Sequence, residues 1–447
     1  MEETQREMEV PLGKTYRLPD FKIIPYKGYF IAVAPELAKW LILENKTQRD
    51  ILFCLVQGKT IQNTMDQYPD AESDIVHVLT QLEAKAIETC RVKSIFSNTR
   101  LHLHLTNLCN LRCPHCYMKS GLSYKEELST EEIQNLCRDF HDQGGTDVSL
   151  TGGEPSIRPD FRNIVAFISQ LGMKVAIYTN GCLWDENLVE FVCQYHLDGV
   201  QISLDGYDED SNAVVRGKGS FEKSLRTIDL FARHNIPVKV AVSAPYEILK
   251  AHSDAYIDFS KRLLKQYGED SLVFNYSYFF MPGRALDAAA IEAHKNEYYN
   301  LVSSVVNGIY GDVSEDSFIN NLIDDCIFDS CGYGGLNVMP NGDFYFCDRI
   351  TDVSKAGNVR NMPFPEIHRL MKIAEEAGRI GHFRPCCHCE LRFICGGGCR
   401  AEYFREFTKT ANIENVDFNA IAPRVCTQEN KERIYDLMIQ SNERFFC

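Results

Sequence analysis

The sequence predicts an α/β protein in which a parallel, helix-covered sheet is flanked by a smaller module on either side. From Arg100 onward, apolar segments rich in β-forming residues alternate six times with helical stretches, which is the pattern of a parallel sheet. Residues 1–95 lack this alternation, and ten of the eighteen cysteines lie between Cys326 and Cys447. A length of 447 residues agrees with about three domains, which we place at residues 1–95, 96–310 and 311–447.

The first module is expected to contain three strands followed by three helices. Short apolar segments predict strands at Phe21–Pro25, Tyr29–Val33 and Lys39–Leu43. Helical spacing of apolar residues then predicts helices from Thr47, over Ile61–Gln67, and over Ala71–Ala86. Three strands and three helices in about 80 residues predict a winged-helix arrangement.

The central sheet is expected to have six strands, at Leu101–Thr106, Asp147–Thr151, Lys174–Thr179, Gly199–Leu204, Val238–Ser243 and Leu272–Phe280. A capping box from Ser129 to Glu132 begins the first long helix, and Gly144-Gly145 ends it. His102 and His104 alternate with leucines, so they share one face of the first strand. We expect them to line the interior or to pack rather than to bind metal.

Three cysteines follow the first predicted strand with the spacing Cys-x3-Cys-x2-Cys, at Cys109, Cys113 and Cys116. A cubane iron–sulfur cluster normally takes four thiolates. Three thiolates leave one iron open for a reacting ligand, as at catalytic metal sites. A zinc knuckle and chance clustering are the alternatives. The loop lies at the carboxyl end of a strand, where parallel α/β folds bind ligands.

Polar and glycine residues also follow the second and fourth predicted strands. Gly152, Gly153 and Glu154 end the second strand; glycines permit close approach of the backbone, and Glu154 can accept hydrogen bonds from an ammonium group. Ser203 ends the fourth strand, and Arg216 follows it. Arg216 can pair with a carboxylate or be an ordinary surface arginine.

The cysteine loop, followed one strand later by Gly-Gly-Glu, resembles the signature of the radical S-adenosylmethionine (SAM) superfamily. The resemblance implies a partial (β/α)6 TIM-like barrel. It also implies a 4Fe–4S cluster whose open iron binds SAM and cleaves it to a 5′-deoxyadenosyl radical. Tyr117 resembles the aromatic position that meets the adenine, and Thr179-Asn180 would face the nucleoside. The implied SAM contacts are Tyr117, Gly152, Gly153, Glu154, Thr179, Asn180, Ser203 and Arg216.

The C-terminal cysteines resemble the seven-cysteine SPASM extension, over roughly residues 326–430. In that family the extension holds two auxiliary 4Fe–4S clusters, for three clusters in total. Carried over by position, the first would take Cys331, Cys347 and Cys399. The second would take Cys386, Cys389, Cys395 and Cys426. Zinc is the alternative, because Cys-x2-Cys pairs often bind it.

Cys326 lies five residues before Cys331 and is expected to be the fourth ligand of the first auxiliary cluster. That cluster would then be closed; without Cys326 it would be open to a substrate thiolate. Cys387 is a competing candidate or a bystander, and Cys447 has no assigned role. The remaining cysteines are expected to be structural thiols: Cys54, Cys90, Cys137, Cys182 and Cys193.

The N-terminal module resembles the precursor-peptide recognition element of enzymes that mature ribosomally made peptides. In that family a leader peptide adds a strand to the sheet edge. The alternative is a DNA-binding winged helix. The third predicted helix is acidic, with Asp70, Glu72, Asp74 and Glu83, and this disfavours DNA.

Composition excludes several other classes. A net charge of −15 and a pI near 5.3 argue against a nucleic-acid surface. No apolar run reaches the ~18 residues of a membrane span, and the charged N-terminus has no signal-peptide pattern. We therefore expect a cytoplasmic protein, in which clustered cysteines bind metal rather than form disulfides.

Together these resemblances predict a radical SAM/SPASM peptide maturase of the sactipeptide or ranthipeptide type, or a related cross-linking enzyme. Its product would be an intramolecular thioether, or next a carbon–carbon or carbon–oxygen link, in a precursor peptide. An external donor such as flavodoxin or ferredoxin would supply electrons. The sequence identifies no catalytic acid or base. Two alternatives stay open: an anaerobic sulfatase-maturating type that oxidises Cys or Ser to formylglycine, and a non-catalytic iron–sulfur redox regulator.

Overall fold

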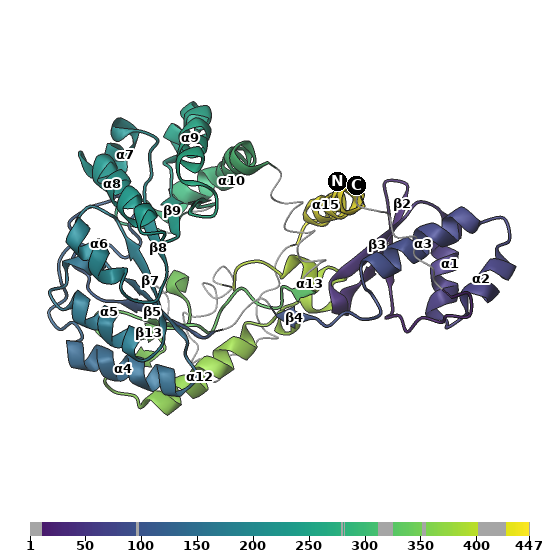
Figure 1. Ribbon diagram of the computed structural model, residues 1–447, viewed down its shortest axis with the longest axis horizontal. Helices are drawn as coiled ribbons and strands as arrows, with labels where there is room; N and C mark the ends of the chain where they lie inside the picture. Colours follow the sequence, from purple (N-terminus) through teal and green to yellow (C-terminus); the bar gives the residue numbers. More distant parts are fainter. Residues whose placement is uncertain are drawn as a thin grey trace.

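The computed structural model describes residues 11–94, 98–278, 280, 282–311, 325–350, 355–400 and 426–446. Figure 1 shows the N-terminal module at one end of the molecule and the central sheet with its helices at the other. Segments from the C-terminal part of the chain lie between the two.

The N-terminal module has the predicted elements. Its antiparallel sheet has the order β1-β2-β3, with β1 at Lys22–Tyr26, β2 at Tyr29–Ala34 and β3 at Lys39–Leu43. Three helices follow: α1 at Lys46–Val56, α2 at Ile61–Gln67 and α3 at Glu72–Ala84. Side-chain caps explain two of the helix starts, because Asn45 accepts from the Gln48 N–H and Thr60 from the Asn63 N–H.

Both faces of this small sheet are covered. Alternate residues such as Ala32 and Leu41 pack with apolar residues of α1 to α3. The opposite residues, including Trp40 and Ile42, pack against the C-terminal helix α15 at Gln428–Phe445. The Trp40 indole N–H donates to the Met438 carbonyl at 3.0 Å. The last helix of the chain therefore completes the core of the first module.

The central sheet of the described chain has nine strands in the order β10-β9-β8-β7-β6-β5-β12-β13-β14. Six are parallel and follow one another in sequence: β5 at Arg100–His104, β6 at Asp147–Thr151, β7 at Lys174–Thr179, β8 at Leu197–Ser203, β9 at Val238–Val242 and β10 at Leu272–Tyr276. The strands at β6 and β7 match the prediction. The strand expected to reach Phe280 ends instead at Tyr276.

Helices cover the sheet as the alternation predicts. They are α4 at Thr130–Asp142, α5 at Phe161–Gln170, α6 at Glu186–Val192, α7 at Glu209–Arg216, α8 at Ser220–Arg233, α9 at Tyr246–Tyr267 and α10 at Ala288–Tyr310. The predicted capping box between Ser129 and Glu132 is present. On β5, Leu101 and Leu103 are fully buried in the main apolar core.

The C-terminal part extends the central sheet and contributes one strand to a separate two-stranded sheet. β12 at Leu336–Val338 pairs in parallel with β5, and β13 at Asp343–Tyr345 and β14 at Gly357–Asn358 continue the sheet. β11 at Cys326–Ile327 pairs with β4 at Lys93–Ser94.

The other described helical segments are η1 at Pro35–Leu37, η2 at Pro155–Ile157, η3 at Asp348–Ile350, α12 at Phe364–Ala377, η4 at Ile380–His382, η5 at Cys386–His388 and α13 at Arg392–Cys395. Cys447 lies outside the described residues. A search of the described helices finds none with the length and apolar character needed to cross a membrane.

Candidate functional site

The three cysteines of the predicted cluster loop lie together at the carboxyl end of β5. The Leu111 N–H donates to Cys109 Sγ at 3.4 Å. Burial raises the pKa of Cys109 and of Cys113, and nearby negative charges raise both further: Glu154 and then Cys116 for Cys109, and Asp205 and then Cys116 and Cys109 for Cys113. Buried thiols beside other negative charges favour the protonated state until a cation is present. A metal that binds thiolates reverses this preference, so the donor set fits an iron–sulfur cluster.

Gly152 and Gly153 hold the next strand against this loop. The Gly153 N–H donates to the Thr106 carbonyl at 2.7 Å, and the Glu154 N–H donates to the Leu108 carbonyl at 2.8 Å. A Cβ atom on Gly153 would lie 2.2 Å from the Leu108 oxygen, and one on Gly152 would lie 2.5 Å from the Thr106 oxygen. These glycines are needed because the cysteine-loop backbone approaches them, a reason that the sequence analysis did not identify.

Glu154 is a fully buried carboxylate directly behind the loop. It accepts from the Thr179 hydroxyl at 2.7 Å, from the Asn180 N–H at 2.8 Å and from the Ser156 hydroxyl at 2.6 Å. Burial raises the pKa of Glu154 despite these bonds. Asn180 also donates to the Asn110 side-chain oxygen at 2.8 Å. Thr179 and Asn180 therefore position Glu154 and the loop, and their contact with a nucleoside stays a prediction.

Arg216 is buried rather than a surface arginine. Its Nε lies 2.7 Å from Oδ2 of Asp205, and the side chains are 10% and 0% exposed. The two groups form an ion pair, but Arg216 Nε and Asp205 Oδ2 are not aligned for a hydrogen bond. His115 Nε2 lies 3.5 Å from the same oxygen, and Arg216 opposes the rise in the Cys113 thiol pKa that burial causes. Ser203, the last residue of β8, precedes this cluster of charges.

Tyr117 lies on the side of the loop that faces the C-terminal part. Burial, then the charges of Asp348, Cys116 and Cys347, raises the pKa of Tyr117, although 36% of the residue is exposed to solvent. Burial lowers the pKa of His104 to about 4, and the charge of Asp348 opposes this decrease. His104 is 2% exposed, as expected for an interior residue of β5.

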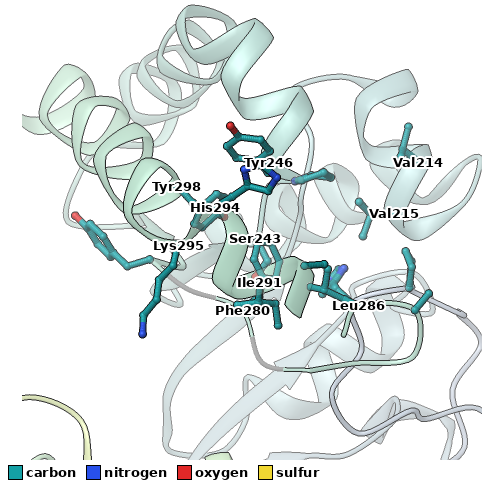
Figure 2. Close-up of a pocket in the computed structure, with 16 residues that line it drawn as sticks. Val214, Val215, Ser243, Tyr246, Phe280, Leu286, Ile291, His294, Lys295 and Tyr298 are labelled. Carbon is teal, nitrogen blue, oxygen red and sulfur yellow. The ribbon is translucent and has the colours of Figure 1, made fainter. Parts of the chain in front are cut away.

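An apolar cavity of about 230 Å³ lies beside the cysteine loop. Its lining includes Pro114 and His115 of the loop, Val215 of α7, and residues near the ends of β9 and β10. Figure 2 shows Val214 and Val215 on one side, His294 and Tyr298 on the other, and Ser243 and Ile291 between them. The Phe280 ring lies 6.0 Å from that of His115 and 5.1 Å from that of Tyr298, between centroids.

Sequence reasoning missed this cavity. His115 lies inside the cysteine loop, and its position there was the one indication in the sequence of a lining residue of this cavity. Its partners come from strand ends that only the fold brings together. Tyr117, the predicted adenine neighbour, is not among the lining residues.

A second cavity, of about 620 Å³, brings together three cysteines of the predicted first auxiliary site. Cys331, Cys347 and Cys399 line it with His102 and Asp348. The Arg400 N–H donates to Cys331 Sγ at 3.4 Å. Cys326 lies in β11, outside the lining residues.

Two residues of the predicted second auxiliary site, Cys389 and Cys426, lie near the start of α15. Cys386 begins η5, Cys389 follows it, and Cys395 ends α13. Although burial lowers the pKa of Lys431, its hydrogen bond to Glu390 and the charges of Cys389 and Cys426 raise it overall. Cys389 and Cys426 therefore both lie near Lys431.

Cys387 is part-buried, and its N–H donates to the Phe383 carbonyl at 2.6 Å. Among the described residues, no three His, Cys, Asp or Glu side chains form a site for a single metal ion.

Comparison with known proteins finds a family match for the central part of the chain. Residues 103–247 match the Radical SAM superfamily. Sporulation killing factor maturation protein SkfB of Bacillus subtilis is 38% identical over 141 residues, which cover 32% of this chain and 34% of SkfB. The chain therefore spans about a third of that relative's length in the match.

Two other relatives match over longer ranges. Antilisterial bacteriocin subtilosin biosynthesis protein AlbA of Bacillus subtilis is 29% identical, over 79% of this chain and 80% of AlbA. Mycofactocin maturase MftC of Mycobacterium tuberculosis is 27% identical, over 67% of this chain and 78% of MftC.

A solved structure of histidine-tagged anSMEcpe with bound AdoMet has a TM-score of 0.54 at 18% identity, and covers 77% of this chain and 95% of that one. This likeness supports the fold. The family implies SAM and a 4Fe–4S cluster as cofactors. The matched residues contain the cysteine loop and Gly-Gly-Glu, and residues 103–247 form a radical SAM domain.

Proposed function

We propose that this enzyme installs an intramolecular cross-link in a ribosomally made precursor peptide, most directly a thioether. The observation that carries the proposal is the match to AlbA, named for bacteriocin biosynthesis, which extends over 79% of this chain and thus well beyond the residues 103–247 that match the superfamily. SkfB and MftC are named as maturation proteins as well. Carbon–carbon and carbon–oxygen links are the next products.

The cysteine loop and the buried carboxylate behind it would bind the reactive pair of cofactors. Cys109, Cys113 and Cys116 would hold the first cluster, and Glu154 would receive the ammonium group of SAM. When bound, the cluster and SAM together supply a hydrogen-abstracting radical. Arg216 would lie too deep in its ion pair with Asp205 to approach SAM unless that pair opens, so we assign it to orienting the loop through Cys113.

The cavity beside the loop is suited to the adenine ring of SAM. Its walls are mostly apolar and aromatic, with few polar groups, as is common for small-molecule sites. A cavity of about 150 Å³ already admits benzene, so a volume of about 230 Å³ can take a larger flat ring. His115 would lie against this ring and Ser243 would supply a hydroxyl.

The cavity at Cys331, Cys347 and Cys399 would hold the first auxiliary cluster, with Cys326 completing it. Cys386, Cys389, Cys395 and Cys426 would hold the second. Three clusters in all would then be present: the first in a barrel of residues 96–310, and the two auxiliary clusters in a C-terminal domain of residues 311–447. A closed auxiliary cluster would take the electron left after cross-linking. Flavodoxin or ferredoxin would be the external electron donor of the enzyme.

Residues 1–95 would bind the leader of the precursor by strand addition, as a recognition element of the winged-helix type. The β1 edge contains Pro25, which has no N–H to donate. On β3, Gln81 accepts from the Ile42 N–H at 2.9 Å and donates to the Ile42 carbonyl at 2.6 Å. At Ile42 this side-chain amide makes both bonds that an added strand would make there, so we place the leader at the β3 edge, where it would displace Gln81.

The test is a reaction with the short peptide encoded beside this gene. Anaerobically reconstituted enzyme, SAM and a reductant should yield a peptide lighter by two hydrogen atoms for each cross-link, located by tandem mass spectrometry. Formation of formylglycine in a sulfatase-derived peptide would instead support the sulfatase-maturating alternative. SAM cleavage that no peptide stimulates would contradict the proposal.

A further inference from the structure

The short strand that carries Cys326 is attached to the N-terminal module. β11 pairs only two residues with β4, Cys326 with Lys93 and Ile327 with Ser94. Two hydrogen bonds from the same segment reach Asp325: the Arg91 N–H donates to its carboxylate at 3.2 Å, and the Lys93 N–H donates to its carbonyl at 2.9 Å. A two-residue strand has little intrinsic stability, so its position depends on side-chain contacts.

The strongest of these contacts comes from the peptide-binding sheet. Lys39, the first residue of β3, places its amine 2.6 Å from the Asp325 carboxylate, and the side chains are 2% and 26% exposed. The same amine donates to the Lys85 carbonyl at 2.7 Å. Because Lys39 is buried, its amine is held in one place. Asp325 has φ of +54°, in the left-handed region that is uncommon for non-glycine residues and enriched in aspartate.

We propose that Lys39 is a positioning residue for Cys326. Its ion pair with Asp325 fixes the backbone immediately before Cys326, and so presents the thiolate to the auxiliary cluster that Cys331, Cys347 and Cys399 would bind. The N-terminal module is thereby part of the support of this cluster as well as a peptide-binding unit. The inference rests on the proposed auxiliary cluster, and it adds a role for a residue more than 280 positions from the nearest of its ligands.

The experiment compares three full-length variants after anaerobic reconstitution. Lys39→Met and Asp325→Asn remove the pair from either side. Lys27→Met is the matched control, because Lys27 also joins the N-terminal module to the C-terminal part, 2.6 Å from Asp436, but at an exposed site. Measurements are iron per chain, the rate of iron loss to a chelator, the electron paramagnetic resonance of the auxiliary clusters, SAM cleavage and leader-peptide affinity.

Lys39→Met and Asp325→Asn should both lose about four irons to the chelator roughly 10-fold or more faster than wild type, the lower end of effects from residues that support metal ligands. The auxiliary resonance should change in both variants while SAM cleavage stays at the wild-type value, and leader affinity should stay at the wild-type value in Asp325→Asn. Lys27→Met should behave as wild type. Asp325 is partly exposed, so Asp325→Asn remains informative if Lys39→Met does not fold.

The inference would be overturned if Asp325→Asn lost iron at the same rate as Lys27→Met and its auxiliary resonance matched that of wild type. A different failure is recognisable in wild type. If wild-type protein holds only about four irons, the proposed auxiliary clusters are wrong and the inference falls with them. If the clusters load but no peptide is modified, the proposed function fails while the role of Lys39 is still decided by iron loss.

Discussion

Replacing Gly153 with alanine should separate the cysteine loop from Glu154. The new Cβ atom would lie 2.2 Å from the Leu108 oxygen and 2.6 Å from the Leu108 carbonyl carbon. Ordinary contact begins at 3.4 Å, so the loop backbone must retreat by about 1.2 Å. Both clashing atoms are backbone, so no side-chain rotation relieves them. A displacement of about 1 Å at a reacting centre typically costs about 100-fold in rate, and we expect that loss in SAM cleavage.

The assay is 5′-deoxyadenosine formation by reconstituted Gly153→Ala, measured by chromatography. Gly13→Ala is the control, because a Cβ atom there meets nothing within 4 Å. Overpacking costs about 1–3 kcal/mol, so circular dichroism should still show a folded protein with a lowered melting temperature. A Gly153→Ala enzyme that cleaves SAM at the rate of Gly13→Ala would refute the assignment of this contact.

Three further predictions follow from the same geometry. Wild-type protein should bind about twelve irons per chain. A variant in which Cys109, Cys113 and Cys116 are all replaced with alanine should lose about four of these irons and should no longer cleave SAM. Calorimetry should show SAM affinity decreasing as pH falls through the raised pKa of Glu154, above the ordinary range for glutamate, because its carboxylate form attracts the ammonium group; Glu154→Gln should bind weakly at every pH, and a flat wild-type profile would contradict this role. Gln81→Ala should bind the leader peptide roughly 30-fold more tightly by fluorescence anisotropy, since two hydrogen bonds of about 1 kcal/mol each no longer need displacing, and unchanged or weaker binding would exclude the β3 edge.

Local patterns in the sequence predicted most of the fold. Alternating apolar residues gave the same bounds as the structure for β6 and β7, and the Ser129 capping box fixed the start of α4. The end of β10 was missed because the apolar run continues past it. Beyond Tyr276 the chain leaves the sheet, and Tyr278 and Phe280 line the apolar cavity instead. Apolar periodicity cannot distinguish these two uses.

Sequence patterns pointed to site residues that lie within a single motif, but they did not predict contacts between segments that are distant in the sequence. The loop cysteines were singled out by their spacing and Glu154 by its place after the second strand, and the structure brings Glu154 against the loop. The ion pair of Arg216 with Asp205 and the contacts of Thr179 with Glu154 depend on how neighbouring strands end. The pairing of β12 with β5, which places Cys331 and Cys347 beside His102, joins segments more than 230 residues apart. No local pattern carries that information.

The packing of α15 on the N-terminal sheet sets an order of events during synthesis. Trp40 and Met438 are 398 residues apart, so the ribosome must make almost the whole chain before one face of that sheet is covered. Until then the apolar side chains of Ile31, Val33 and Ile42 face water on a nascent chain, where exposed apolar surface promotes aggregation. Contacts of such long separation also slow folding. Expression yield should therefore depend on chaperone supply.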